Sequence, residues 1–218
     1  MFSLDAGKEG SCPGATKVCE KICYAKRGRF RFSNLQQRYK LNREASLTTD
    51  FVKRVVQKIR LERFLYFRIH VSGDFYSTAY IAKWLQIVKL CPNVYFYAYT
   101  RSWRESQLVA GLQMLANMEN FSLFLSADQE TGPPVAMANT RVAYLQLDDE
   151  DVPDFVPDMV FRNKKRTIQK RVLNVIVCPL ENGTKAETSC QQCQLCFDWS
   201  RLATANRGVA TLQVLQGN

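Results

Sequence analysis

The chain has 218 residues, 46% of them hydrophobic, which is enough to bury a substantial core. No run approaches the roughly 18 apolar residues that a membrane span needs, and the start "MFSLDAGKEG" lacks the basic and apolar regions of a secretory signal. The sequence therefore predicts a cytoplasmic protein without membrane contact, and its formal net charge of +10 favours polyanionic partners.

Short runs rich in β-branched and aromatic residues predict strands, because they are too continuously apolar for a sheet with one wet face. Amphipathic patterns between them predict helices, the third of which follows a capping box of Ser102 and Glu105. The segment from 148 to 171 is charged and contains proline, so we expect an excursion from the sheet there. The expected strands are 64–71, 93–100, 121–127, 141–147 and 172–178, with "MFSL" as a sixth, and the expected helices are 50–61, 79–90 and 104–116.

Alternation of strands and helices predicts right-handed βαβ crossovers, and hence an α/β fold of about six mostly parallel strands. We expect one domain over residues 1–218, with a cysteine loop in 1–32 and a cysteine-rich tail in 178–199. Six strands suit an open doubly wound sheet or a partial (βα) barrel, and periodicity alone leaves both open.

Seven of the eight cysteines fall into two clusters, whereas Cys91 stands alone and suits a buried apolar position. Because a reducing cytoplasm opens disulfides, metal binding is the first explanation to weigh for the clusters. The first cluster has the spacing C-x6-C-x3-C and the second C-x11-C-x2-C-x2-C. The members are Cys12, Cys19 and Cys23 in the first, and Cys178, Cys190, Cys193 and Cys196 in the second.

Closely spaced thiolates of this kind are typical of cubane iron–sulfur ligation, and we expect one or two 4Fe–4S clusters. The tail supplies four thiolates, which zinc also accepts. The N-terminal cluster supplies three, which would leave one iron open to another ligand and to redox chemistry. A single cluster shared by both groups of cysteines is the alternative.

Polar residues stand where the predicted strands end, and the carboxyl ends of parallel strands meet at one rim, where ligands bind. We therefore expect "HVSGDFYS" to face the cysteine loop across this rim. His70 is a candidate ligand or proton donor, or else a core histidine. Asp74 binds a ligand or caps the next helix, and Arg101 holds an anion or pairs with a carboxylate. Further rim candidates are Ser72 and Gly73.

Three basic runs make nucleic acid, DNA or RNA, the leading macromolecular partner. They are "KRGRFRF" (26–32), "KRVVQKIRLER" (53–63) and "RNKKRTIQKR" (162–171). Phosphates would supply the affinity, and Phe30 and Phe32 in the first run would stack on bases. The alternative is that these runs form solvent-exposed faces that only keep the protein soluble.

Several motifs together resemble the phage gene product 88 family over nearly the whole chain. They are "SLDAGKEGSCPGATKVCEKICYA", "RIHVSGDFYSTAYIAKWLQI", "VYFYAYTRS" and "CQQCQLC", with Asp5 where the family pattern has proline. That family is distantly similar to radical S-adenosylmethionine enzymes, which implies a partial barrel, a cysteine loop after the first strand, and a ligand motif at "SGDF" (72–75). The radical-enzyme pattern C-x3-C-x2-C is incomplete, because Lys26 stands in place of its third cysteine.

Three hypotheses follow for the function. The first in order of preference is a nucleic-acid-binding iron–sulfur protein of a phage or mobile element, whose cluster is structural or redox-sensing. The second is a redox or radical-type enzyme with an open-coordination cluster, in which Ser72, Gly73 and Asp74 bind S-adenosylmethionine. The third is a zinc-stabilised binding protein. The sequence predicts no substrate and no oligomeric state.

Overall fold

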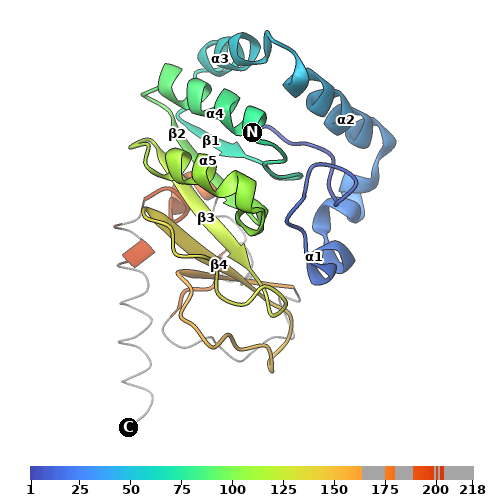
Figure 1. Cartoon of the computed structure of the whole chain (residues 1–218), viewed down its shortest axis with the longest axis vertical. Coiled ribbons are helices and arrows are strands. Elements are labelled where there is room, and N and C mark those ends of the chain that lie inside the picture. Colours follow the sequence, from blue (N-terminus) through green and yellow to red (C-terminus); the bar gives the residue numbers. More distant parts are fainter. Residues whose placement is uncertain (164–174, 180–188, 199, 201, 204–218) are drawn as a thin grey trace. The chain divides into compact units, whose positions relative to one another are not determined.

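The computed structural model describes residues 1–163, 175–179, 189–198, 200, 202 and 203 (Figure 1). The chain divides into two compact units, the first made of Met1–Phe124 with Val135–Thr140, and the second of Leu125–Pro134 with Arg141–Asn218. A single domain over residues 1–218 stays a prediction.

The strands form one sheet in the order β1-β2-β3-β4-β5, and both β1–β2 and β4–β5 pair in parallel. This confirms the predicted α/β class with a partial barrel of parallel strands, but the described residues contain five strands rather than six. The strands are β1 (Tyr66–Ile69), β2 (Tyr95–Thr100), β3 (Phe121–Ala127), β4 (Thr140–Gln146) and β5 (Met159–Arg162).

Two of the expected strands do not form in the described residues. "MFSL" makes a single parallel bridge, Phe2 to Ile69, because the next backbone bond runs from Leu4 N–H to the carbonyl of Ser72, beyond the end of β1. Of the expected strand 172–178, residues 172–174 lie outside the described residues, and Val177 makes one parallel bridge to Val160.

Strand β5 (Met159–Arg162) lies within the stretch for which we expected an excursion from the sheet. Its four residues are too few to establish a period, and acidic and basic runs flank it. Burial of Met159 and Val160 stabilises it despite its length.

All three expected helices form, but the predicted capping box is wrong, because Ser102 begins a 3-10 turn and Glu105 precedes the helix without a side-chain cap. Helix α2 was missed, because its apolar side chains do not keep to one face: Leu41 and Leu47 are exposed. The helices are α1 (Lys17–Ile22), α2 (Ser33–Leu47), α3 (Phe51–Leu61), α4 (Thr78–Leu90), α5 (Ser106–Ala116) and α7 (Cys190–Cys193), with 3-10 turns η1 (Tyr24–Lys26), η2 (Gly28–Arg31) and η3 (Ser102–Arg104).

The core of the first unit is built around Trp84 of α4, which is fully buried. Its ring lies 6.1 Å from that of Phe67 on β1 and 5.9 Å from that of Phe51 on α3, measured between centroids. Phe2 contacts both Phe51 and Trp84 edge-on, at 5.4 and 5.7 Å. The first residues of the chain are therefore anchored in the same core that places β1 and α4.

In the second unit, the acidic run 148–154 folds back on β4. Asp151 accepts a short hydrogen bond from the Tyr144 hydroxyl and a 2.7 Å bond from the N–H of Leu147. Asp158 accepts from the N–H of Val142 at 2.8 Å, which joins β4 to the start of β5. None of the helices in the described part of the chain combines the length and apolar character needed to cross a membrane.

Candidate metal centre

The three N-terminal cysteines lie on one short stretch of chain. The predicted cysteine loop 1–32 contains α1, η1 and η2, so the name cysteine loop is kept from here on for residues 5–16 only. Cys12 belongs to this loop, and Cys19 lies in α1. The helix begins at its N-cap Thr16, whose hydroxyl accepts a 2.9 Å bond from the N–H of Cys19, and Cys23 is its C-cap. Cys19 and Cys23 are four residues apart, which brings their side chains to the same side of the helix.

The cysteine loop is fixed to the end of β1. Leu4 N–H donates to the carbonyl of Ser72 at 2.8 Å, and the Ser72 hydroxyl returns a 2.7 Å bond to the carbonyl of Leu4. The N–H of Asp74 donates to the carbonyl of Ser11 at 3.1 Å. Gly73, with φ of +84°, lies so close that an added Cβ would stand 2.5 Å from the Ser11 hydroxyl and 2.6 Å from the Cβ of Leu4.

The loop also rests on the end of β2. A Cβ at Gly14 would lie 2.0 Å from the carbonyl oxygen of Arg101, so only glycine allows this approach. The Arg104 guanidinium donates to the carbonyl of Gly14 at 2.9 Å. As expected, then, the cysteine loop opens on the rim formed by the carboxyl ends of β1 and β2.

Asp74 joins these two strand ends to each other. Its Oδ1 accepts from the Thr100 hydroxyl at 2.6 Å and from the N–H of Phe75 at 2.7 Å, and its Oδ2 accepts from the N–H of Arg101 at 2.8 Å. Burial raises the pKa of Asp74 despite these hydrogen bonds. Helix α4 is capped by Ser77 instead, whose hydroxyl accepts from the N–H of Tyr80.

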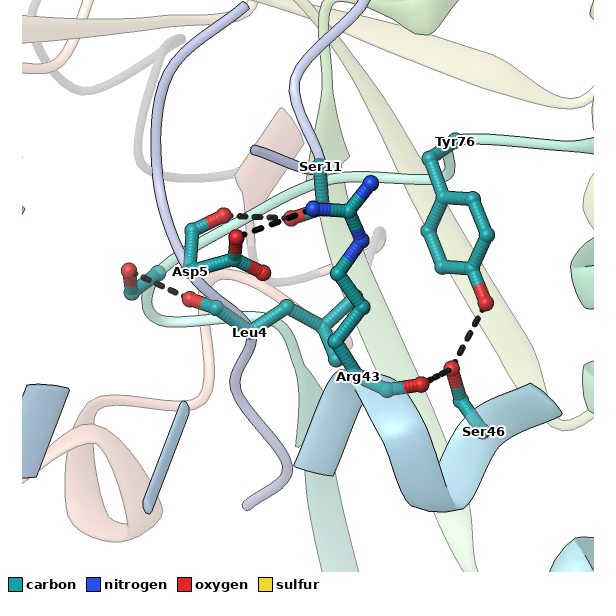
Figure 2. Close-up of polar contacts among 7 residues, drawn as sticks. Leu4, Asp5, Ser11, Arg43, Ser46 and Tyr76 are labelled. Atoms are coloured by element: carbon teal, nitrogen blue, oxygen red, sulfur yellow. Dashed lines mark hydrogen bonds and ion pairs between the residues drawn. The ribbon is translucent and has the colours of Figure 1, made fainter. Parts of the chain in front are cut away.

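A polar network joins the base of the cysteine loop to α2 (Figure 2). Asp5 accepts two bonds from Ser11 at its carbonyl, and its carboxylate forms a 3.1 Å ion pair with Arg43. Ser46 lies one turn further along α2 and bonds the carbonyl of Arg43 and the hydroxyl of Tyr76, each at 2.6 Å. The contacts of Arg43, Ser46 and Tyr76 could not be predicted from the sequence; the only signal was Asp5, where the resemblance described above implies proline.

His70 lies in the core. Its Nε2 is 2.8 Å from the hydroxyl of Tyr80, and its ring packs against Phe75 and Trp84 at centroid distances of 4.9 and 6.4 Å. Burial, with the nearby positive charge of Arg68 as a smaller cause, lowers the pKa of His70 to about 3. The imidazole is therefore neutral at pH 7, and the geometry supports a packing role rather than proton donation.

The burial of His70 makes the stability of the folded protein depend on pH in a defined way. Because the folded pKa of His70 lies below the unfolded value, the unfolded state binds one more proton between about pH 6.5 and pH 3, and stability falls as the pH falls, by about 1.4 kcal/mol per unit. From pH 7 to pH 5 the loss from this group is expected to be about 2 kcal/mol. Urea unfolding at pH 7, 6 and 5 measures it. His70→Asn should show a shallower pH dependence by that amount, and an unchanged slope would contradict the assignment.

Cys12, Cys19 and Cys23 form no disulfide and are half-buried. Burial, followed by the charges of Asp74, Cys19 and Cys23, raises the pKa of Cys12 to about 12. Among the residues that the structure describes, no three His, Cys, Asp or Glu side chains stand close enough to hold a single metal ion. An iron–sulfur cluster at this triad therefore stays a prediction.

Ser72, Gly73 and Asp74 fit S-adenosylmethionine poorly. The Ser72 hydroxyl and both Asp74 oxygens are already hydrogen-bonded within the chain, and both side chains are buried. A Cβ at Gly73 would strike the cysteine loop, so the space beside this glycine is filled. The motif therefore seats the cysteine loop rather than forming an open ligand site.

The tail cysteines belong to the second unit. Cys178 is buried, and its N–H donates to the carbonyl of Val160 at 2.9 Å. Cys190 and Cys193 are the first and last residues of α7, which begins with a capping box of Ser189 and Gln192. Gln194, with φ of +63°, turns the chain before Cys196. None of these four cysteines forms a disulfide, and sharing of one cluster with the N-terminal triad stays a prediction.

Comparison with known proteins places the chain among phage proteins. A family model described as Gene product 88 matches residues 1–198. The chain is 31% identical to the Gene 88 protein of Mycobacterium phage L5, covering 92% of this chain and 83% of the relative, and 30% identical to the Gene 88 protein of Mycobacterium phage D29, covering 90% and 82%. No solved structure matches. The chain therefore belongs to the phage gene product 88 family.

Proposed function

We propose that the chain is an iron–sulfur protein in which Cys12, Cys19 and Cys23 hold a cluster at the carboxyl ends of β1 and β2. The observation that carries this proposal is that Cys12 lies on a loop fixed to both strand ends, and that α1, with Cys19 and its C-cap Cys23, follows this loop directly. Soft thiolates are the ligands that iron–sulfur clusters prefer, and a cytoplasm would leave these thiols reduced.

The chain's own residues prepare the site in two ways. Gly14 and Gly73 allow the loop to approach the strands, and the ion pair of Asp5 with Arg43 holds its base. The raised pKa of Cys12 means that its thiol carries a proton without metal, so iron binding must displace that proton. A bound cubane with three protein thiolates supplies one-electron transfer and one open iron position.

A structural or redox-sensing role suits this site better than a radical reaction. Ser72 and Asp74, the side chains expected to hold S-adenosylmethionine, have their polar atoms bound within the chain. The tail cysteines, Cys178 with Cys190, Cys193 and Cys196, provide a second set of thiolates for a second cluster or for zinc.

Nucleic acid is the partner that the charge distribution favours. From Lys21 to Arg43 the sequence has eight basic residues and no acidic one, between Glu20 and Glu44. Such a stretch attracts phosphates, and binding would weaken as salt rises. A phage protein that combines a cluster with this surface suits a role in which the redox state or integrity of the cluster affects a nucleic-acid complex.

Anaerobic purification with iron, sulfide and zinc analysis tests the cluster. Wild-type protein is expected to be brown, with about four iron atoms and four sulfides per cluster. Cys19→Ala should lose the iron of the N-terminal site, whereas Cys91→Ala, which changes a cysteine outside both clusters, should retain it. A colourless protein with stoichiometric zinc would leave only the zinc-stabilised alternative.

A further inference from the structure

The basic stretch that follows Cys23 lies in the first unit, and most of its residues are exposed. We define the arginine surface as η1, η2 and the first part of α2, residues 24–40. In Figure 1 this segment runs from α1 into α2, both drawn in blue. Five of its six basic residues form no ion pair within the described part of the chain, and all five are exposed: Arg27, Arg29, Arg31, Arg38 and Lys40.

Local contacts fix the backbone of this surface. The Tyr24 hydroxyl donates a short bond to the carbonyl of Val71, just beyond β1. The Gln36 side chain, on the first turn of α2, donates to the carbonyl of Phe30 at 2.6 Å. The Tyr24 and Phe30 rings pack edge to face at 5.5 Å. The surface is therefore tied to the same rim that carries the cysteine loop.

Two aromatic residues stand exposed among these charges. Phe32 is 61% exposed and Tyr24 is 51% exposed, although burial of aromatic rings is strongly favourable. Phe30 is half-buried against Tyr24, so of the two phenylalanines expected to stack on bases only Phe32 presents an open ring. An exposed ring that follows arginines closely in the chain is suited to binding unpaired bases and their phosphates.

We infer that the arginine surface binds single-stranded nucleic acid, with Phe32 stacking on a base and Arg29 and Arg31 contacting phosphates. Single strands fit better than a duplex, because paired bases offer no free face to Phe32. This inference rests on the nucleic-acid partner in the proposed function, and it adds the strand type and the location. It does not require the cluster, since none of these three residues is a cysteine-loop residue.

Fluorescence anisotropy with labelled dT20, rU20 and a 20-base-pair duplex tests the inference. Wild-type protein should bind the single strands at least about ten-fold more tightly than the duplex. Phe32→Ala should weaken binding of the single strands about ten-fold. The double variant Arg29→Ala/Arg31→Ala should weaken it as well and make the salt dependence shallower, by about 0.7 for each lost phosphate contact.

Two control variants distinguish the contribution of this surface to binding from that of positive charge in general. Arg54→Ala/Lys58→Ala removes two positive charges from α3, where each residue pairs with an acidic neighbour, Asp50 or Glu62. Leu47→Ala removes an apolar side chain that is 67% exposed at the far end of α2. Both should bind like wild type.

Three results would overturn the inference. The first is equal weakening by the two double variants, and the second is duplex binding as tight as single-strand binding. The third is tighter binding to phosphatidylserine vesicles than to dT20. If no oligonucleotide binds while iron and sulfide are retained, the nucleic-acid partner is wrong but the cluster proposal stands. If iron is absent and dT20 still binds at this surface, the cluster proposal is wrong but the nucleic-acid partner stands.

Discussion

Gly73→Ala is expected to destabilise the first unit by about 2–5 kcal/mol and to lower iron content with it. Two costs add. At φ of +84° an L-residue is strained, and the new Cβ would meet the Ser11 hydroxyl at 2.5 Å and the Cβ of Leu4 at 2.6 Å. This steric clash is relieved only if the cysteine loop moves away from the end of β1. Urea unfolding and iron analysis of the same preparation measure both effects.

Gly28→Ala is the matched control for this substitution. Gly28 also has a positive φ, +53°, but an added Cβ meets nothing within 4 Å. Gly28→Ala should therefore cost only the backbone strain of a positive φ, about 1–2 kcal/mol. Equal destabilisation by the two alanine variants would mean that the close seating of the loop on β1 does not contribute to stability.

Asp74→Asn is expected to destabilise by about 3 kcal/mol, although the side chain keeps its size. Oδ1 accepts from the Phe75 N–H and Oδ2 accepts from the Arg101 N–H, so an amide must turn its NH2 toward one of these backbone donors in either orientation. One buried N–H then loses its partner. Thermal or urea unfolding of the two proteins measures the difference.

Asp50→Asn provides the comparison, because Asp50 is exposed at the start of α3 and its pairing with Arg54 spans 3.9 Å. It should leave the unfolding midpoint nearly unchanged. If Asp74→Asn were as mild, the buried carboxylate would not be the link between β1 and β2, and an open ligand-binding role for Asp74 would regain support.

The strand ends show how far the sequence determines this site. Parallel strands place their carboxyl ends together, so the meeting of "SGDF" with the cysteine loop and Arg101 could be predicted from the order of the elements alone. The role of Asp74 could not, because a carboxylate at a strand end serves a ligand, a helix cap or a neighbouring strand equally well. Only the positions of Thr100 and the Arg101 N–H decide among these.

Helix α2 and His70 were hard to predict for a different reason. Periodicity detects a helix that buries one face, and α2 buries few of its residues, with Arg43 and Ser46 held by polar contacts. His70 looked like a rim residue because it follows β1 directly. Its ring instead turns into the core of Tyr80, Phe75 and Trp84, contacts that depend on how α4 packs.

Retention of a cluster by the N-terminal triad alone is the most direct test of the proposed function. We would isolate Cys190→Ala/Cys193→Ala/Cys196→Ala anaerobically and measure iron, acid-labile sulfide and zinc. About four iron atoms and four sulfides per chain, lost again when Cys19→Ala is added, are expected. A folded triple variant without iron or sulfide would contradict a cluster held by Cys12, Cys19 and Cys23.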